Sequence, residues 1–496
     1  MIHLLLAAVV NCQTGQPFAQ TNPDSVSVER TEIVSRSRRE SRSVVVKRRT
    51  GERSPGIVFE PCEYHLADRT TIDAEIGRMK VPELRGPRGS ARNGTSITLG
   101  MIRLRSSKRR SAPPIVYLDG TPRGLSASDL MTFPRLAQFF DSLTSAGDVI
   151  LMDYRGAGLS TPNVSCKATA TLDGDTFLDR AHAARYFLQN ARQCVESLRS
   201  RSIDPSAYTW DAVAHDVEDV KRALGAARIN IVGFSSGTHA ALAVLRKYPR
   251  SINRVALVGT EGPDNTRKLP LSGDSAIQRI TTDPSLHEGF ASLAKRVIGK
   301  LGGAPLQVTV TVTDSLGRRE ITGRFGAFGL QYLTAKSISG PRESATLQPL
   351  YTSIDRGDTR LLRRVLERII ASGDFNVLEF LLDGSSGISA KRAAQIESEA
   401  STAILGDAQS FPYPEILAAL KITPLPDWFR KPVVSSVPAL FVTGELDGNT
   451  PVFQAEQVRR GFARSDHIIV PGAGHADPMS SPTVARQIAQ FLSDGG

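Results

Sequence analysis

The sequence lacks any hydrophobic run long enough to cross a membrane. A transmembrane helix needs about 20 consecutive apolar residues, and the N-terminal run from Leu4 to Val10 contains seven. This run instead fits the apolar segment of a secretory signal peptide over residues 1–20, with cleavage near Ala19 or Gln20. We therefore predict a secreted or periplasmic protein without a transmembrane segment. The alternative is a cytoplasmic protein whose N-terminus is poorly ordered.

Cysteine is also scarce, which excludes several kinds of site. The chain has four cysteines, and none has the close paired spacing of a zinc site or a redox motif. Neither a metal nor an organic cofactor is predicted. If export removes Cys12 with the signal peptide, Cys166 and Cys194 flank one predicted helical segment and are expected to pair. Cys62 would then remain single.

Aromatic residues make up only 6% of the chain, whereas basic residues are in excess. The net charge is +11, and the segment from Glu29 to Arg53, with nine Lys or Arg and four Glu, contributes +5 of it. A Ser-rich charged run with few aromatics is typical of a flexible, solvated arm, which we assign to residues 21–56. Because no aromatic interleaving or known motif accompanies this charge, a nucleic-acid partner is not expected. The composition does not indicate an oligomeric state.

The rest of the chain alternates between buried-looking strands and helices. Apolar runs that end in Gly, Pro or Asp are followed by helix-like stretches, which indicates a mostly parallel sheet with helices on both faces. We assign this α/β core to residues 57–262 and 433–496. The intervening residues 263–432 form a mostly helical insertion. Within it, the alternating segments 306–313 and 319–326 predict a β-hairpin.

One strand-to-helix junction contains a motif for nucleophilic catalysis. The sequence Gly-Phe-Ser-Ser-Gly, residues 233–237, follows an apolar strand and precedes a helix-like stretch. It fits Gly-x-Ser-x-Gly, in which the serine lies on a strained turn and the glycines avoid collisions two residues to either side. Ser235 is therefore the candidate nucleophile. Centring the motif on Ser236 would place Phe234 and Thr238 in the crowded positions.

A serine nucleophile needs a histidine base and a carboxylate that orients the histidine. In this arrangement the acid follows the serine in sequence and the histidine comes last. Asp447 and His475 each follow a predicted strand, at the edge where open α/β sheets place their sites. Glu445 is a weaker candidate for the acid. Three other histidines lie within helices or open a strand and are expected to have no catalytic role: His215, His239 and His467.

The same chemistry requires two N–H donors that bind the oxyanion of the tetrahedral intermediate. The first is expected to be the backbone N–H of Ser236. The second donor normally comes from the loop after an earlier strand. The sequence Tyr-Leu-Asp-Gly-Thr-Pro-Arg-Gly forms that loop, so the N–H of Gly120 or Thr121 is the candidate.

Together these stretches resemble the proline iminopeptidase and tripeptidyl aminopeptidase family of α/β-hydrolases. The resemblance covers about residues 62–491. Five segments occur in the family's order: residues 75–85, 153–160, 233–237, 444–451 and 472–475. The resemblance implies an α/β-hydrolase fold with the insertion as a cap over the active site. It also implies Ser235, Asp447 and His475 as the triad and a peptide N-terminus as the substrate.

Two features depart from the family pattern, the oxyanion loop and the residue after the candidate nucleophile. The oxyanion loop usually ends in Gly-Gly-Pro-Gly but here is Gly120-Thr121-Pro122-Arg123, and Thr and Arg restrict its backbone. Ser236 also occupies a position where these peptidases often have Tyr or Trp. Three residues that match the family are interpreted as scaffold of the turn and the site: Asp153, Arg155 and Gly156.

An aminopeptidase must pair the substrate ammonium group with a carboxylate, because burying that charge alone is costly. Asp447 is committed to His475, so the partner is expected in the insertion. The family has an acidic residue near Glu399, which is our candidate. The alternative is that Glu397 and Glu399 are solvated glutamates on a helix surface.

The sequence therefore predicts a serine hydrolase that works through an acyl-enzyme, with a peptide or a small acyl compound as substrate. An aminopeptidase that releases residues from peptide N-termini is the first interpretation. A carboxylesterase or other acyl hydrolase is the second, because one fold hosts many chemistries. A non-enzymatic binding protein is the third, and the complete set of triad residues argues against it.

Overall fold

The computed structural model describes most of the chain. The described residues are 10–11, 53–54, 56–65, 71–86, 89–92, 94–106, 112–120, 131, 133–168, 170, 172–279, 289–314, 317–371 and 374–493. The predicted signal peptide and basic arm lie almost entirely outside these ranges, and Thr121 lies outside them too. In the part of the chain that is described, no helix combines the length and the apolar character needed to cross a bilayer.

A single large sheet forms the centre of the molecule. Its strand order is β1-β3-β4-β5-β7-β6-β9-β10-β14-β15, with β2 beside β3. Every neighbouring pair from β7 to β15 is parallel, whereas β3, β4, β5 and β7 pair antiparallel. The strands are β1 (Val10–Asn11), β2 (Arg53–Ser54), β3 (Ile57–His65), β4 (Thr71–Pro82), β5 (Ser96–Leu104), β6 (Ile115–Leu118), β7 (Val149–Met152), β9 (Ile229–Phe234), β10 (Ile252–Val258), β14 (Ala439–Gly444) and β15 (Ser465–Val470).

Side chains of the central strands alternate between two hydrophobic clusters, one on each face of the sheet. In β9, Ile231 packs with helices α4, α5 and α15, while its neighbour Val232 packs with helices α2 and α16. These helices are α2 (Pro134–Leu143), α4 (Trp210–Ala223), α5 (Ser236–Lys247), α15 (Val452–Arg459) and α16 (Pro482–Ser493). Burial on both faces explains why these strands are continuously apolar in sequence, and the predicted α/β architecture is confirmed.

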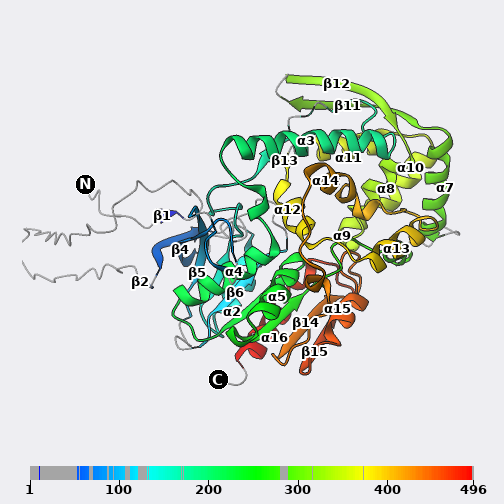
Figure 1. The fold of residues 1–496 in the computed structure, drawn as a ribbon. Helices are drawn as coiled ribbons and strands as arrows, with labels where there is room; N and C mark the ends of the chain where they lie inside the picture. The colour runs from blue at the N-terminus through cyan, green and yellow to red at the C-terminus, as the bar shows by residue number, and fades with distance from the viewer. Residues whose placement is uncertain are drawn as a thin grey trace, which may run out of the picture.

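The insertion folds into a mostly helical cap (Figure 1). Its elements are α6 (Pro270–Gln278), α7 (Gly289–Gly303), β11 (Leu306–Asp314), β12 (Gly317–Phe325), α8 (Ala327–Ala335), α9 (Pro341–Ser344), α10 (Leu347–Asp355), α11 (Arg360–Ala371), β13 (Asp374–Phe375), α12 (Val377–Ser386), α13 (Ala390–Ala400) and α14 (Tyr413–Leu420). Strands β11 and β12 pair antiparallel from Leu306↔Phe325 to Asp314↔Gly317, which confirms the predicted hairpin. This hairpin lies at the outer edge of the cap (Figure 1).

The cap also includes a segment that the sequence analysis assigned to the core. Phe177 stacks on Tyr332 with 6.1 Å between ring centroids, and Phe187 meets Phe411 at 5.4 Å. Both residues lie at helix α3 (Arg180–Ser200) or just before it. The first half of α3 packs into the cap cluster, whereas Cys194, Val195 and Leu198 pack into the core cluster. Helix α3 therefore joins the two parts, a role that helical periodicity alone does not reveal.

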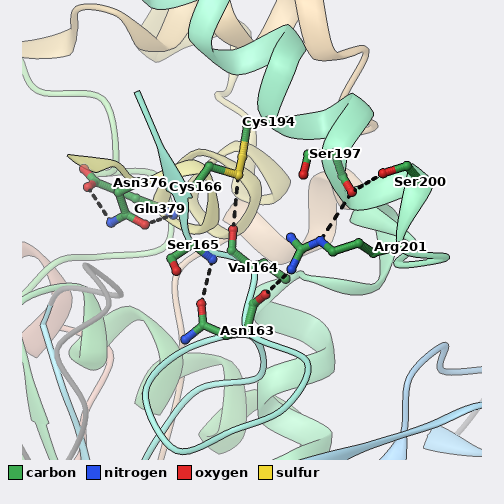
Figure 2. The surroundings of a disulfide bond; sticks show 10 residues. All are labelled: Asn163, Val164, Ser165, Cys166, Cys194, Ser197, Ser200, Arg201, Asn376 and Glu379. Atoms are coloured by element: carbon green, nitrogen blue, oxygen red, sulfur yellow. Dashed lines mark hydrogen bonds between the residues drawn. A yellow bond between two sulfur atoms is a disulfide. The ribbon is translucent and has the colours of Figure 1, made fainter. Parts of the chain in front are cut away.

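A disulfide bond ties α3 to the strand that precedes it (Figure 2). Cys166 and Cys194 are bonded, with their Cα atoms 5.8 Å apart, as the sequence analysis expected for an exported protein. Cys166 lies in β8 (Cys166–Lys167), which pairs antiparallel with β13 of the cap, directly before α12. The disulfide thus anchors the entry of the chain into α12. The expectation that Cys62 stays single is wrong, because Cys62 is also disulfide-bonded.

Candidate active site

The turn between β9 and α5 has the conformation that a nucleophilic serine requires. Ser235 has φ 53° and ψ −123°, a left-handed backbone conformation that non-glycine residues rarely adopt. A Cβ atom at Gly233 would lie 2.7 Å from the carbonyl oxygen of Gly237, and one at Gly237 would collide with the carbonyl oxygen of Leu118. Only glycine fits at these two positions. The motif is therefore centred on Ser235, with the strain at that residue.

Three predicted residues from distant parts of the sequence form one hydrogen-bonded chain. The hydroxyl oxygen of Ser235 lies 2.9 Å from Nε2 of His475, and Nδ1 of His475 lies 2.8 Å from Oδ2 of Asp447. Each residue follows the carboxyl end of a parallel strand: Ser235 follows β9, Asp447 follows β14 and His475 follows β15. The three strand ends meet at one edge of the sheet, which brings the side chains together.

The environment of Asp447 keeps its carboxylate ionised. The residue is fully buried, and its Oδ1 accepts hydrogen bonds from the backbone N–H groups of Asn449 and Thr450, both at 2.8 Å. The hydroxyl of Thr450 donates to Oδ2 at 2.7 Å. Burial raises the pKa of Asp447, but the charge of His475 and these hydrogen bonds outweigh burial and lower that pKa below its ordinary value. A negative charge therefore faces the histidine.

The candidate oxyanion groups lie beside Ser235. Ser236 is the first residue of α5, so its N–H has no intrahelical acceptor and lies at the positive end of the helix. Gly120 is in backbone contact with the turn, because a Cβ atom there would lie 2.6 Å from Cβ of Ser235. The Ser236 hydroxyl donates a hydrogen bond to the Gly120 carbonyl oxygen. Thr121, the other candidate, falls outside the described residues.

One cap segment supports the loops that carry the histidine and the acid. The backbone N–H of His475 donates to the carbonyl oxygen of Ser339 at 2.9 Å. The next cap residue, Gly340, approaches Gly474 so closely that a Cβ atom on it would lie 2.7 Å from the Gly474 Cα. A surface hollow of about 700 Å³ lies beside this segment and is lined by Leu446, but it contains none of the triad residues. The segment therefore supports the loops that carry Asp447 and His475.

The alternative acid and the other histidines are engaged elsewhere. Glu445 is exposed and accepts a hydrogen bond from the N–H of Gly472 at 2.8 Å. The three histidines are bound as follows: His215 to Tyr248, His239 to Ser386 and the Gly262 carbonyl, and His467 to Glu456 and Thr443. Burial lowers the pKa of His215 to about 4, with a further contribution from Lys247. These groups support the fold.

The family-like segment after β7 also has a structural role. Arg155 is fully buried and makes two hydrogen bonds to the Asp216 carboxylate, at 2.7 and 2.8 Å. Asp153 accepts a hydrogen bond from the N–H of Leu159 at 2.7 Å. Gly156 adopts φ 83°, which favours glycine. These contacts fix the turn beneath the site, as the sequence analysis interpreted them.

Glu399, the predicted ammonium-binding residue, lies near the end of α13, and its carboxylate faces the N-terminus of α6. Its Oε2 accepts a hydrogen bond from the N–H of Leu271 at 3.1 Å, and its Oε1 accepts one from Gln395 at 2.7 Å. An acidic group at a helix N-terminus stabilises that helix. Both oxygens are therefore occupied in contacts within the cap. This placement agrees with the alternative of a surface glutamate and gives no support to substrate binding by Glu399.

A different pair of cap carboxylates lies near the strand ends. Glu379 and Asp383 are four residues apart on α12 and therefore share one face of the helix. The hydroxyl of Tyr413 lies 2.8 Å from an oxygen of each carboxyl group. Burial, and then the negative charges of Glu261 and Glu379, raise the pKa of Asp383 well above its ordinary value. This pair was not predicted from the sequence, although two acidic residues four apart among the apolar residues of one helix are a usable signal.

Contacts link this pair to the oxyanion loop. Nε1–H of Trp210 donates to Oδ1 of Asp383 at 3.2 Å. The Trp210 ring meets the Tyr154 ring at 5.4 Å, and the Tyr154 hydroxyl donates to the carbonyl oxygen of Asp119 at 2.7 Å. Asp119 directly precedes Gly120. Asp383 is therefore two aromatic side chains away from the loop that touches Ser235.

The described residues contain no group of three or more His, Cys, Asp or Glu placed to hold a metal ion. The α/β-hydrolase fold is defined by the strand order, by the strained turn at Ser235 and by the strand-end loops that carry Asp447 and His475. The chain has this fold, and two family models agree with it. Residues 113–297 match the family described as alpha/beta hydrolase fold, and residues 418–496 match the family described as TAP-like protein.

The matches to individual curated proteins cover smaller parts of the chain. The chain is 30% identical over 145 residues to a 2-hydroxy-6-oxononadienedioate/2-hydroxy-6-oxononatrienedioate hydrolase of Paraburkholderia phymatum, which covers 29% of this chain and 48% of that protein. A hydrolase of the same name from Burkholderia vietnamiensis is 32% identical over 90 residues, 18% of this chain and 31% of that protein. The chain thus spans about half or less of the length of these curated relatives.

Among solved structures, a thermophilic esterase from Thermogutta terrifontis is 16% identical, with a TM-score of 0.34, over 84% of this chain and 97% of the esterase. A proline iminopeptidase-related protein from Thermus thermophilus is 17% identical, with a TM-score of 0.34, over 80% of this chain and 94% of that protein.

Proposed function

We propose that this protein is a serine hydrolase that uses Ser235, His475 and Asp447 through an acyl-enzyme. The observation that carries the proposal is the hydrogen-bonded chain from Ser235 to His475 to Asp447, with distances of 2.9 and 2.8 Å. These are the distances at which a histidine takes a proton from a serine while a carboxylate holds its ring. The strained turn at Ser235 supports the same role.

Each of the three residues has its own role in the proposed reaction. The Ser235 oxygen bonds to the substrate carbonyl carbon while its proton passes to Nε2 of His475, and the carbonyl oxygen becomes an oxyanion. His475 then gives the proton to the leaving group, whose bond to the carbonyl carbon breaks. Water repeats the sequence on the acyl-enzyme and releases the acid. Asp447 orients His475 and stabilises its charged form throughout.

We further propose that the substrate is a peptide with a free N-terminus. The match of residues 418–496 to the TAP-like family supports an aminopeptidase, as does the Glu379–Asp383 pair. An ammonium group that leaves water needs a carboxylate partner, and this pair offers two carboxyl groups near the oxyanion loop. In this proposal Glu379 and Asp383 take the role that the sequence analysis assigned to Glu399.

The hydrogen bonds of the pair indicate its charge. The Tyr413 hydroxyl has one hydrogen, yet carboxyl oxygens of both Glu379 and Asp383 lie 2.8 Å from it. A second hydrogen bond requires a proton on one carboxyl group. Asp383 suits this role, because its pKa is raised well above the ordinary value. Asp383 then holds a proton in the unliganded protein, and an arriving ammonium group would displace that proton to solvent.

A second candidate is a hydrolase of small carboxylic esters or related acyl compounds. The curated relatives support it, because both are named as hydrolases of an unsaturated dicarboxylic acid. This candidate keeps the triad and removes the requirement for a free amine. The two candidates therefore differ in what the cap binds.

A substrate panel separates the two candidates. Aminoacyl, dipeptidyl and tripeptidyl fluorogenic amides are compared with the same compounds acetylated at the N-terminus and with short p-nitrophenyl esters. The aminopeptidase proposal predicts turnover of at least one free-amine amide and at least a tenfold lower kcat/KM for its acetylated form. Turnover of the esters together with equal rates on free and blocked amides would favour the acyl hydrolase.

We also propose that the protein functions in an oxidising compartment outside the cytoplasm. The Cys166–Cys194 disulfide supports this, because such bonds persist in secreted and periplasmic proteins. Mass spectrometry of protein from its native compartment should find Cys166 and Cys194 linked to each other. Retention of Met1 with free thiols at both positions would place the protein in the cytoplasm.

A further inference from the structure

The residue after the nucleophile uses its side chain as well as its backbone. Ser236 is only 6% exposed, and its hydroxyl donates to the carbonyl oxygen of Gly120, a residue 116 positions earlier in the chain. The contact joins the serine turn directly to the loop after β6. Because the Ser235 hydroxyl is held by His475, the two adjacent serines have separate partners.

The Gly120 loop has no other side-chain hydrogen bond at this carbonyl among the described residues. The neighbouring Asp119 carbonyl is held by the hydroxyl of Tyr154 at 2.7 Å. Gly120 itself lies on the serine turn, in contact distance of Ser235 and Phe234. The loop is therefore fixed at two successive carbonyl groups, by Tyr154 from the core and by Ser236 from the turn.

Holding a carbonyl oxygen fixes more than one atom. A peptide unit is planar, so a hydrogen bond to its oxygen sets the orientation of the whole plane. While the Gly120 oxygen accepts the Ser236 hydrogen bond, its peptide plane cannot rotate without losing that bond. Without that hydrogen bond the plane is free to rotate, and the carbonyl dipole then opposes the developing charge. Preorganised dipoles of this kind are a large part of acyl-transfer catalysis.

We propose that the Ser236 hydroxyl is a positioning residue for oxyanion stabilisation, which acts by holding the Gly120 carbonyl and so couples the oxyanion loop to the nucleophile turn. The inference rests on the proposed serine-hydrolase function. It adds a side-chain role to a residue whose backbone N–H alone was expected to take part. It also gives a reason for serine at this position.

The test measures how strongly the site stabilises an oxyanion. Ser236→Ala, Ser236→Cys and Ser236→Thr are compared with wild type for kcat and KM on p-nitrophenyl butyrate. The same proteins are titrated with an aryl trifluoromethyl ketone, whose carbonyl carbon bonds to the serine oxygen and whose oxygen becomes an oxyanion. Ser251→Ala is the matched control, because Ser251 is similarly buried at 8% exposure but lies before the start of β10, at the opposite edge of the sheet.

Ser236→Ala should lower kcat by about ten- to a hundredfold, a loss in the range found for groups that stabilise an oxyanion. KM should stay within about twofold, and the inhibition constant of the ketone should rise by the same factor as kcat/KM falls. Ser236→Thr, which keeps the hydroxyl, should recover most of the loss. Ser236→Cys, whose thiol is a weak donor, should have a kcat between those of Ser236→Ala and Ser236→Thr. Ser251→Ala should keep the wild-type kcat.

Two results would overturn the inference while leaving the proposed function intact. One is an active wild type whose Ser236→Ala and Ser236→Cys variants keep kcat and ketone affinity within twofold. The other is an equal loss in all three Ser236 variants with a lowered melting temperature, which would mean a packing role. A wild type that neither hydrolyses the ester nor binds the ketone would instead contradict the serine-hydrolase function itself, and the inference with it.

Discussion

The core and the cap differ in how their functional groups are assembled. In the core, each triad residue follows the end of a parallel strand, and the fold of the sheet places the three together. In the cap, the carboxyl pair on α12 is held by Tyr413, by Trp210 and by the β8–β13 pairing. These contacts join segments far apart in sequence. In the proposed function, the core therefore sets the reaction, whereas the packing of the cap sets which substrates reach it.

The strongest test of the core is removal of the nucleophile. Ser235→Ala should lower turnover by about 10⁴-fold or more, because the attacking oxygen is lost while the hydrogen-bonded supports remain. Turnover is measured on the best substrate of the panel, and the melting temperature should stay close to that of wild type. A folded Ser235→Ala protein with more than a tenth of wild-type activity would place the reaction elsewhere.

The anchoring of the cap is tested through the disulfide. In the chain-entropy model, a bond between residues 28 positions apart stabilises the folded protein by roughly 3.6 kcal/mol. The double variant Cys166→Ala, Cys194→Ala should lose about that much in denaturant unfolding. Because β8 pairs with β13 directly before α12, KM for free-amine peptides should also rise. Unchanged stability and unchanged KM would show that the bond does not anchor the cap.

The selectivity of the cap is tested by neutralising its carboxylates singly. Asp383→Asn and Glu379→Gln should each raise KM for free-amine peptides about tenfold or more, since the ammonium group loses a charged partner. The factor by which kcat/KM falls on free-amine peptides should be at least ten times the factor by which it falls on a small ester. The ratio of these two factors measures the selectivity of the cap. Glu399→Gln is the matched control and should leave this ratio unchanged. If Glu399→Gln alone changes this peptide-to-ester ratio, Glu399 binds the ammonium group, as the sequence indicated.

The smallest expected effect is a pH dependence confined to amine substrates. The pKa of Asp383 is raised by burial first and then by the charges of Glu261 and Glu379. Below this pKa the carboxyl group holds its proton and binds an ammonium group weakly. KM for free-amine peptides should therefore fall as pH rises through that pKa, until the substrate amine loses its own proton near pH 8. KM for N-acetylated peptides should show no such change.

The difference between the two regions also explains how much could be predicted from the sequence. The serine turn and the strand-end positions of Asp447 and His475 follow from local rules, because glycine spacing and apolar runs specify a strand that ends in a sharp turn. The hairpin 306–325 follows from alternation. Glu399 and Glu379 both lie on cap helices, and what distinguishes Glu379 is its hydrogen bond with Tyr413, which only the folded cap determines.

Other features could not be read from the sequence because they depend on contacts between distant segments. Phe177 and Phe187 lie in a segment that reads as core, yet their rings pack on Tyr332 and Phe411 in the cap. The Ser236 hydroxyl is a further case, because its partner is a backbone carbonyl whose approach only the folded sheet determines.

The central claim is that Ser235 is the nucleophile of a working triad, and covalent labelling tests it most directly. A fluorophosphonate probe reacts with a serine oxygen only when a histidine activates that serine, and mass spectrometry of the digested adduct locates the modified residue. The account predicts one adduct per chain, on Ser235, which is lost in Ser235→Ala and strongly slowed in His475→Ala. An adduct on Ser236, or a folded wild-type protein that is not labelled, would contradict it.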